Sequence, residues 1–292
     1  MRKKRISLST IILVIILLVG LSVMLYPTVS DWWNSRVQSQ AIASYDSVVE
    51  QIDDNQYDEI MSRAYEYNNA LAHVDFPLSS PDIVPGYEDI LNISGTGIMG
   101  YITIPVINVQ LPIYHGTSEE ILNVAAGHLQ GSSLPVGGNT THSVISAHRG
   151  LPSARLFSDL DRLNVGDTFT ITILDEILTY EVEEINIVLP HEVSRLSISE
   201  DRDLVTLMTC TPYGINSHRL LVRAHRIETV YPHNVKVAAD ALKIDPMLVV
   251  PGICAPLMVI LIISWIVSGK KRRLRSAKEI FDDINSSKKE GD

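Results

Sequence analysis

Two apolar segments, one near each end of the chain, set the strongest limit on how it can fold. The first runs from Ile6 to Tyr26 and follows the basic cluster 2–5. The second runs from about Met247 to Val267 and precedes the basic cluster 270–275. Each is about long enough to cross the ~30 Å hydrocarbon layer of a membrane as a helix. A folded, water-exposed domain must therefore lie between them.

The two basic clusters lie on the outer side of both segments, so the positive-inside rule predicts a cell-membrane protein with both termini in the cytoplasm. Residues from about 30 to 246 are then extracellular. No small-residue cleavage site follows Tyr26, which favours an uncleaved anchor over a cleaved signal peptide. For the second segment the alternative is a buried core helix, but the basic cluster after it favours a membrane span.

The net charge of −10 hides an uneven distribution of charge along the chain. Four Lys and Arg lie in the first 30 residues, and eight Lys and Arg with five Asp and Glu lie in the tail from residue 269. The part between holds 12 basic and 29 acidic residues, a charge of about −17. Such an acidic body argues against nucleic acid as a partner. It suits substrates that bring their own lysines, and equally it suits plain solubility.

The composition changes twice between the apolar segments. Residues 30–72 place apolar side chains at helical spacing, which predicts one or two amphipathic helices acting as a stalk. Residues 73–91 are rich in proline and read as a loop. From residue 98, many short β-rich runs predict a mostly β barrel or sandwich, with a hairpin around residues 175–176 and short helices after residue 118 and over 156–163. The predicted organisation is an anchor over 1–29, a helical stalk and loop over 30–94, a β domain over 95–230, a linker over 231–246, a second transmembrane helix over 247–268 and a basic cytoplasmic tail over 269–292.

The stretch from residue 203 to 226 carries the first candidate for chemistry. Residues 204–209 read as a buried strand that ends at Cys210, and residues 211–214, Thr-Pro-Tyr-Gly, break it. A second apolar run, 220–222, follows, with Arg219 at its start. A guanidinium near a thiol favours the thiolate or stabilises the oxyanion that forms when it attacks a carbonyl. Arg223 could share the same strand face, so the spacing alone leaves two arginines in contention.

A candidate acid or base comes from another β-rich run, 144–147, which ends at His148. The second cysteine, Cys254, lies in the second apolar segment and cannot bridge to Cys210. An unpaired extracellular thiol points to a reactive group, and the alternative is an inert buried cysteine. The histidines at 115, 128, 142 and 148 have no metal-ligand spacing, and the acidic residues are scattered. Neither a metal nor another cofactor is expected.

Three motifs in the same order resemble the sortases, the cysteine transpeptidases of Gram-positive cell surfaces. They are S-A-H-R-G at 146–150, T-L-M-T-C at 206–210 and the arginine nine positions after the cysteine. The sequence segments 98–105, 111–120 and 209–226 resemble those of the pilus-assembling branch, class C. This resemblance covers roughly residues 95–230. It implies an eight-stranded β-barrel in which Cys210 is the nucleophile, His148 the acid and base, and Arg219 rather than Arg223 the third catalytic residue.

The resemblance also implies a reaction and its partners. Cys210 would cleave an LPxTG-like sorting signal between Thr and Gly through a thioester and pass the pilin to a lysine amine of another pilin. With a cell-wall precursor amine as acceptor the enzyme would anchor proteins, and with water it would be a peptidase. Two other classes remain open: a papain-like protease, disfavoured because Cys210 follows a strand, and a non-catalytic membrane scaffold.

One family feature is altered in this chain. Pilus sortases carry a lid loop whose Asp-Pro-aromatic triplet covers the catalytic cysteine. Here the order is Asp75-Phe76-Pro77, and no Asp-Pro-Trp or Asp-Pro-Phe occurs. Two interpretations follow. Either Asp75 offers a carboxylate to Arg219 and Phe76 a ring to Cys210, or the segment is a plain surface loop and the site has no lid.

Overall fold

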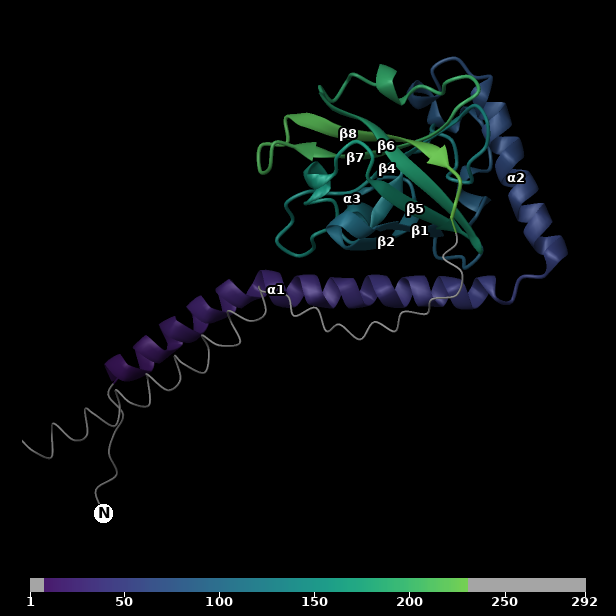
Figure 1. Ribbon diagram of the computed structural model, residues 1–292. Helices are drawn as coiled ribbons and strands as arrows, with labels where there is room; N and C mark the ends of the chain where they lie inside the picture. Colours follow the sequence, from purple (N-terminus) through teal and green to yellow (C-terminus); the bar gives the residue numbers. More distant parts are fainter. Residues whose placement is uncertain (1–7, 231–292) are drawn as a thin grey trace, which may run out of the picture. The chain divides into compact units, whose positions relative to one another are not determined.

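A computed structural model describes residues 8–230 of the chain, and in it eight strands close into a single barrel (Figure 1). The order around the barrel is β1-β2-β3-β4-β7-β8-β6-β5. The strands are β1 (Ile98–Ile104), β2 (Val109–His115), β3 (Ala126–His128), β4 (Thr141–Ser146), β5 (Thr168–Ile173), β6 (Glu176–Val188), β7 (Asp203–Thr211) and β8 (His218–Ile227). The prediction of a mostly β, eight-stranded barrel is confirmed.

Two of the strand pairs are parallel, and one of them positions the candidate site. β2 pairs with β3 and β4 pairs with β7 in parallel, while the remaining neighbours are antiparallel. Because β4 and β7 run in the same direction, their carboxyl ends meet at one end of the barrel. The residues that follow β4 and those that end β7 are therefore neighbours, although about 60 positions separate them in sequence.

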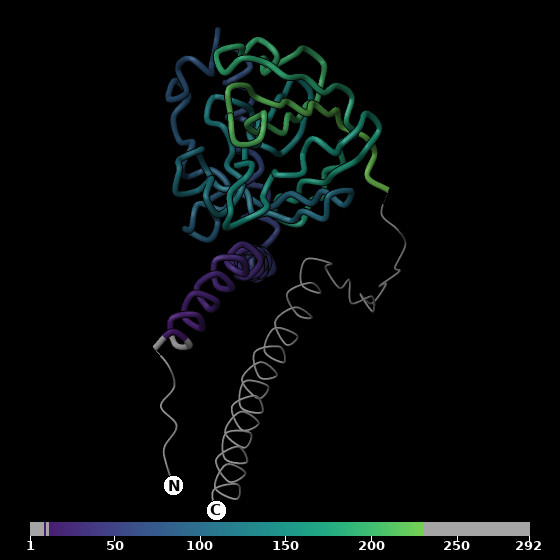
Figure 2. The backbone as a smooth tube through the Cα atoms, turned by 90° about the vertical axis from the view of Figure 1, so that its left-hand side faces the viewer, coloured from purple at the N-terminus to yellow at the C-terminus, as the bar shows by residue number. Residues whose placement is uncertain are grey.

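The first helix, α1 (Leu8–Val49), is 42 residues long and contains Pro27. Proline inside a helix removes one hydrogen bond and bends the helix, and Figure 1 shows the first part of α1 tilted away from the barrel. Figures 1 and 2 show its later part lying along one side of the barrel. Tyr45, which is fully buried, donates a hydrogen bond from its hydroxyl to the Met99 carbonyl (2.8 Å) and accepts one from the Leu174 amide (2.8 Å).

Among the residues that the structure describes, α1 is the one helix long and apolar enough to cross a membrane. Its apolar part ends where the exposed aromatic side chains Tyr26, Trp32 and Trp33 begin, the side chains that favour a membrane–water interface. The second predicted span, 247–268, lies outside the described residues.

The second helix, α2 (Asp54–Ala72), begins at a capping box in which Asp53 and Gln56 each satisfy the other's backbone amide. One face of α2 is buried, and Met61, Tyr67 and Leu71 belong to the same apolar core as the barrel interior. The region predicted as a stalk thus also contributes to the core of the β domain. From α2, a proline-rich segment with three short 3₁₀ helices leads to β1: η1 (Pro77–Ser79), η2 (Pro81–Ile83) and η3 (Tyr87–Asp89).

The sequence identified most of the elements, with two exceptions. The hairpin around residues 175–176 is confirmed as β5 and β6. The predicted helix after residue 118 is reduced to α3 (Glu119–Leu122), because the residues that follow it enter β3. The predicted helix over 156–163 contains only the 3₁₀ helix η5 (Leu160–Arg162). The remaining 3₁₀ helices are η4 (Pro105–Ile107) and η6 (Ser194–Leu196).

Candidate active site

Strands β7 and β8 place Cys210 and Arg219 directly opposite each other. They form an antiparallel pair in which Cys210 is the register partner of Arg219. Directly opposed residues of an antiparallel pair project their side chains from the same face of the sheet. The barrel interior takes the alternate residues Val205 and Leu207, so Cys210 and Arg219 lie on the outer face. Both side chains are partly exposed, and Cys210 is a free thiol.

Strand β4 brings His148 to the other side of Cys210. The parallel register pairs Ser146 with Met208. It continues one step further, because the Ala147 amide donates to the Met208 carbonyl (3.2 Å) and the Thr209 hydroxyl donates to the Ala147 carbonyl (2.8 Å). His148 is the residue after Ala147, and Cys210 is the residue after Thr209. On this register the three predicted residues form one row across β4, β7 and β8, with Cys210 in the middle.

The loop after His148 is tied to its surroundings by backbone and ionic contacts. The Phe157 amide donates to the His148 carbonyl (3.1 Å), and the Gly150 amide donates to the Ser158 hydroxyl (3.0 Å). The neighbouring Arg149 forms an ion pair with Asp161 and contacts the Thr211 hydroxyl (3.4 Å). Arg149 thus has a structural role that links the His148 loop to the end of β7.

The Arg219 guanidinium has no carboxylate partner within residues 8–230. Its hydrogen bonds go to the backbone carbonyls of Asn216 (3.3 Å) and His218 (3.2 Å), both in or beside the β7–β8 turn. By contrast, Arg223, four residues further along β8, forms ion pairs with Glu183 (2.8 Å) and Glu184. A guanidinium held only by neutral carbonyls keeps its charge available for an incoming anion, whereas that of Arg223 is already neutralised.

An apolar patch lies beside the row on the same outer face. It is formed by buried side chains from β4, β6, β8 and η6, with partly buried side chains packed against them: Val144, Val188, Leu196, Leu221, Leu78, Leu129 and Met208. Leu78 comes from η1, so the proline-rich segment lies across this face. A second contact fixes the segment, since the Gln130 amide group donates to the Asp82 carboxylate (2.9 Å).

The two lid candidates, Asp75 and Phe76, lie just before η1, and both are exposed. Phe76 adopts a left-handed conformation (φ 54°), and 81% of its surface is exposed. It is Leu78, two residues later, that packs on the apolar patch. Composition could have indicated Leu78, as an apolar residue in a proline-rich loop. It lies outside the Asp-Pro-aromatic triplet on which the lid prediction rested. The roles of Asp75 and Phe76 stay a prediction.

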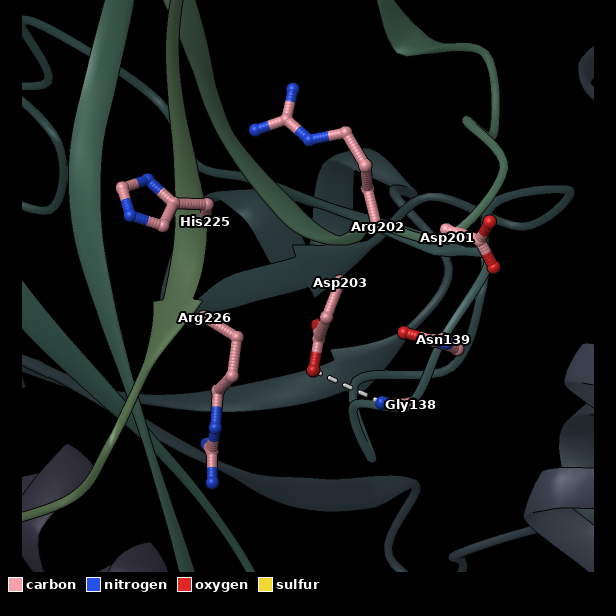
Figure 3. A pocket seen from close by; sticks show the side chains of 7 residues that line it. All are labelled: Gly138, Asn139, Asp201, Arg202, Asp203, His225 and Arg226. Atoms are coloured by element: carbon pink, nitrogen blue, oxygen red, sulfur yellow. Dashed lines mark hydrogen bonds between the residues drawn. The ribbon is translucent and has the colours of Figure 1, made fainter.

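The opposite end of β7 carries a cavity of about 480 Å³ with a different character (Figure 3). Its lining comes from the loop before β4, the turn before β7, and strands β7 and β8: Gly138, Asn139, Asp201, Arg202, Asp203, His225 and Arg226. The Asp203 carboxylate accepts hydrogen bonds from the Gly138 amide (3.0 Å) and the Tyr180 hydroxyl (3.0 Å). Burial raises the pKa of Asp203, and these hydrogen bonds offset the effect only in part. Because Asp203 and Cys210 lie seven positions apart along one strand, this cavity is not part of the candidate active site.

Two further histidines are buried and satisfied rather than reactive. The ring of His142 contacts the Ser197 carbonyl (2.9 Å) and the Thr206 hydroxyl (2.7 Å). The ring of His128 contacts the Tyr87 hydroxyl (2.9 Å) and the Ser133 carbonyl (2.8 Å). Burial lowers the pKa of each to about 4, so both are neutral at pH 7. Within residues 8–230, no three His, Cys, Asp or Glu side chains are grouped to hold a metal ion.

Comparison with known proteins agrees with this geometry. A family model described as the sortase domain matches residues 102–227. Sortase C1 from Streptococcus agalactiae is 49% identical and superposes with a TM-score of 0.60 over 65% of this chain and 100% of that one. The chain belongs to the sortase family, in class C. Sortase C from Clostridium perfringens, solved with the C-terminal cell wall sorting motif, is 44% identical over 65% of this chain and 100% of its own, with a TM-score of 0.58.

Curated sequences match this sortase over a shorter region. Sortase A of Streptococcus agalactiae is 30% identical over 135 residues, which is 45% of this chain and 54% of that protein. The chain thus spans about half the length of the curated relatives that it matches first. The residues that match the sortase-domain model, 102–227, include His148, Cys210 and Arg219.

Proposed function

We propose that this chain is a membrane-anchored cysteine transpeptidase that joins pilin subunits through isopeptide bonds. The observation that carries the proposal is the row itself. On the strand register, a free, partly exposed thiol near the end of β7 lies between a histidine two residues after β4 and an arginine of β8 that has no carboxylate partner within residues 8–230. Membership of class C and the N-terminal apolar helix support the choice of substrate and location.

In the first half of the reaction, the Cys210 sulfur attacks the carbonyl carbon of the Thr–Gly peptide bond in an LPxTG-like sorting signal. Negative charge develops on the carbonyl oxygen, and the Arg219 guanidinium stabilises it. The C–N bond then breaks, His148 gives a proton to the departing glycine amine, and the pilin remains bound to Cys210 as a thioester.

In the second half, a lysine amine of another pilin attacks the thioester carbonyl. His148 takes the proton from that amine, the C–S bond breaks and Cys210 leaves as thiolate. An amide bond joins the two pilins, so atoms and protons balance over the cycle. A basic acceptor also suits the part of the chain between the two apolar segments, in which acidic residues outnumber basic ones.

The test uses the full chain in lipid nanodiscs, with a pilin that carries an LPxTG-like tail and acceptor lysines. The two cysteines of the chain supply a matched pair of variants, Cys210→Ala and Cys254→Ala. We expect lysine-linked pilin multimers by mass spectrometry from the native chain and from Cys254→Ala, and none from Cys210→Ala. Cleaved but unlinked pilin would contradict lysine as the acceptor, and a cell-wall precursor amine would be tried next. No thioester and no cleavage with any tail would contradict the enzyme assignment and favour the scaffold.

A further inference from the structure

The part of α1 just after its apolar segment contacts the loop that follows His148. The Asp31 carboxylate accepts a hydrogen bond from the Arg155 amide (2.8 Å), and the Asn34 side-chain amide donates one to the Ser153 carbonyl (2.7 Å). The two α1 residues are three positions apart, so they lie on the same face of the helix. Both bonds reach backbone groups of the loop, and such bonds fix the path of a loop independently of its side chains.

This face of α1 is continuous with the face that docks on the barrel. Gln38 donates to the Val124 carbonyl (2.7 Å), Ile42 is 7% exposed and Tyr45 is fully buried. The spacing of Asp31, Asn34, Gln38, Ile42 and Tyr45 follows one helical stripe. The two bonds to the loop therefore extend toward the apolar segment a line of contacts that includes the buried Tyr45 further along the helix.

The loop transmits the contact to His148 over a short path. Arg155 is two residues from Phe157, whose side chain is fully buried and whose amide donates to the His148 carbonyl (3.1 Å). Between His148 and Arg155, Leu151 and Ala154 form an isolated bridge that closes the turn contacted by α1. A displaced turn would therefore move the backbone of His148, because the Phe157 amide that bonds to it lies two residues from the Arg155 amide that bonds to α1.

We propose that Asp31 and Asn34 are positioning residues that hold His148 beside Cys210 from the membrane-proximal turns of α1. This inference rests on the proposed function and adds to it a role for the part of α1 between the apolar segment and the barrel. Asp31 and Asn34 lie beside Trp32 and Trp33, where the chain leaves its apolar segment. In this proposal, docking of α1 on the barrel also fixes the position of His148.

The principal test compares the double variant Asp31→Ala/Asn34→Ala with Gln38→Ala in the full chain in nanodiscs. Gln38→Ala removes a similar bond from the same helix face, but that bond goes to Val124 rather than to the His148 loop. For the double variant we expect kcat to fall roughly 10- to 100-fold, the scale of a displacement of about 1 Å. KM should stay within about twofold, because Arg219 and the β7–β8 turn are untouched. Gln38→Ala should keep kcat within about twofold.

Two further measurements separate positioning from loss of structure. An ester in place of the Thr–Gly amide has a leaving group that needs less help from an acid, so the double variant should lose less activity on it. Asp31→Asn keeps the acceptor oxygen and should keep the native rate. An equal loss on amide and ester substrates, or an equal loss in Gln38→Ala, would overturn the proposal.

Hydrogen exchange provides a readout that does not depend on catalysis. Peptides covering residues 148–163 should exchange faster in the double variant than in the native chain, and the Phe157 amide should be among the affected sites. Unchanged exchange in this loop would overturn the positioning role even if the native chain proved to have another activity. Absence of transpeptidation by the native chain, with faster exchange in the variant, would contradict only the proposed function.

Discussion

The two ends of β7 present polar groups in opposite ways. At the Asp203 end, defined by Asp203, Arg223 and their partners, these charged groups have counterparts: Arg223 and Arg202 pair with Glu183, and Asp203 accepts two hydrogen bonds. Burial acts to raise the pKa of Glu183, but its hydrogen bonds from the two arginines outweigh burial and hold that pKa below its ordinary value. These groups stabilise the barrel.

At the Cys210 end, defined by His148, Cys210 and Arg219, the groups are partly exposed and have few side-chain partners within residues 8–230. A satisfied group resists change in its charge, whereas catalysis requires groups that can exchange protons and accept a new partner. Pairing, rather than residue type, therefore distinguishes the structural residues at one end of β7 from the candidate catalytic residues at the other. The first two predictions below test that contrast with one residue from either end.

The largest expected effect distinguishes two histidines, His142 within β4 and His148 just after it. His148→Ala should lower kcat by roughly 10²- to 10⁴-fold, the usual contribution of a general acid and base, with little change in the free energy of unfolding. His142→Ala should do the opposite. It leaves the Ser197 carbonyl and Thr206 hydroxyl without partners and should cost about 2–4 kcal/mol of stability, with the activity per folded molecule retained. Transpeptidation rates and urea unfolding measure both, and a similar stability loss in the two variants would break the contrast.

The two arginines of β8 form the second pair. Arg219→Ala should lower kcat by about 10²- to 10³-fold, because it removes the donor to the developing oxyanion. Arg223→Ala should leave kcat within about twofold and reduce stability by about 1–3 kcal/mol, since Glu183 and Glu184 lose a charged partner. Arg219→Lys serves as control, because it keeps the charge but not the planar donor pair. A larger catalytic loss in Arg223→Ala than in Arg219→Ala would reverse the assignment that the family motif made.

The third prediction concerns pH and the buried histidines His128 and His142. Burial lowers the pKa of each to about 4, below the ordinary value of 6.5, so the unfolded chain binds more protons than the folded one between these values. Stability should therefore be full above about pH 6.5 and fall as the pH drops toward 4. The loss should reach about 2 kcal/mol per histidine at pH 5.

Urea unfolding of the native chain at pH 7 and pH 5 measures this loss. His142→Asn should show a smaller difference between the two pH values, because one of the two titrating groups is gone. An equally steep dependence in that variant would show that other groups cause the acid sensitivity.

The sequence anticipated the Cys210 end better than the Asp203 end, for a physical reason. Cys210, His148 and Arg219 each stand at a strand terminus next to a turn, and turn residues mark strand termini in a single sequence. That the termini meet depends on the parallel pairing of β4 with β7, which no local pattern encodes. The sequence grouped His148 with Cys210 and Arg219 through the family resemblance. The roles of Asp31 and Asn34 depend on the docking of α1 over more than 100 positions in sequence, so no spacing rule could indicate them.

The smallest expected effect separates Leu78 from Phe76 in the segment that lies across the outer face. Leu78 packs on the apolar patch with Met208 and Leu221, one strand step from Cys210 and Arg219, whereas 81% of the Phe76 surface is exposed. Leu78→Ala should loosen the segment and change the rate of Cys210 alkylation by a thiol reagent by about two- to fivefold, because removal of a partly buried apolar side chain costs only about 1–2 kcal/mol. Phe76→Ala should leave that rate within about 1.5-fold, because no buried contact is lost. A larger change in Phe76→Ala than in Leu78→Ala would show that the ring covers the thiol in solution, and the lid interpretation of Asp75 and Phe76 would then replace that of a plain surface loop.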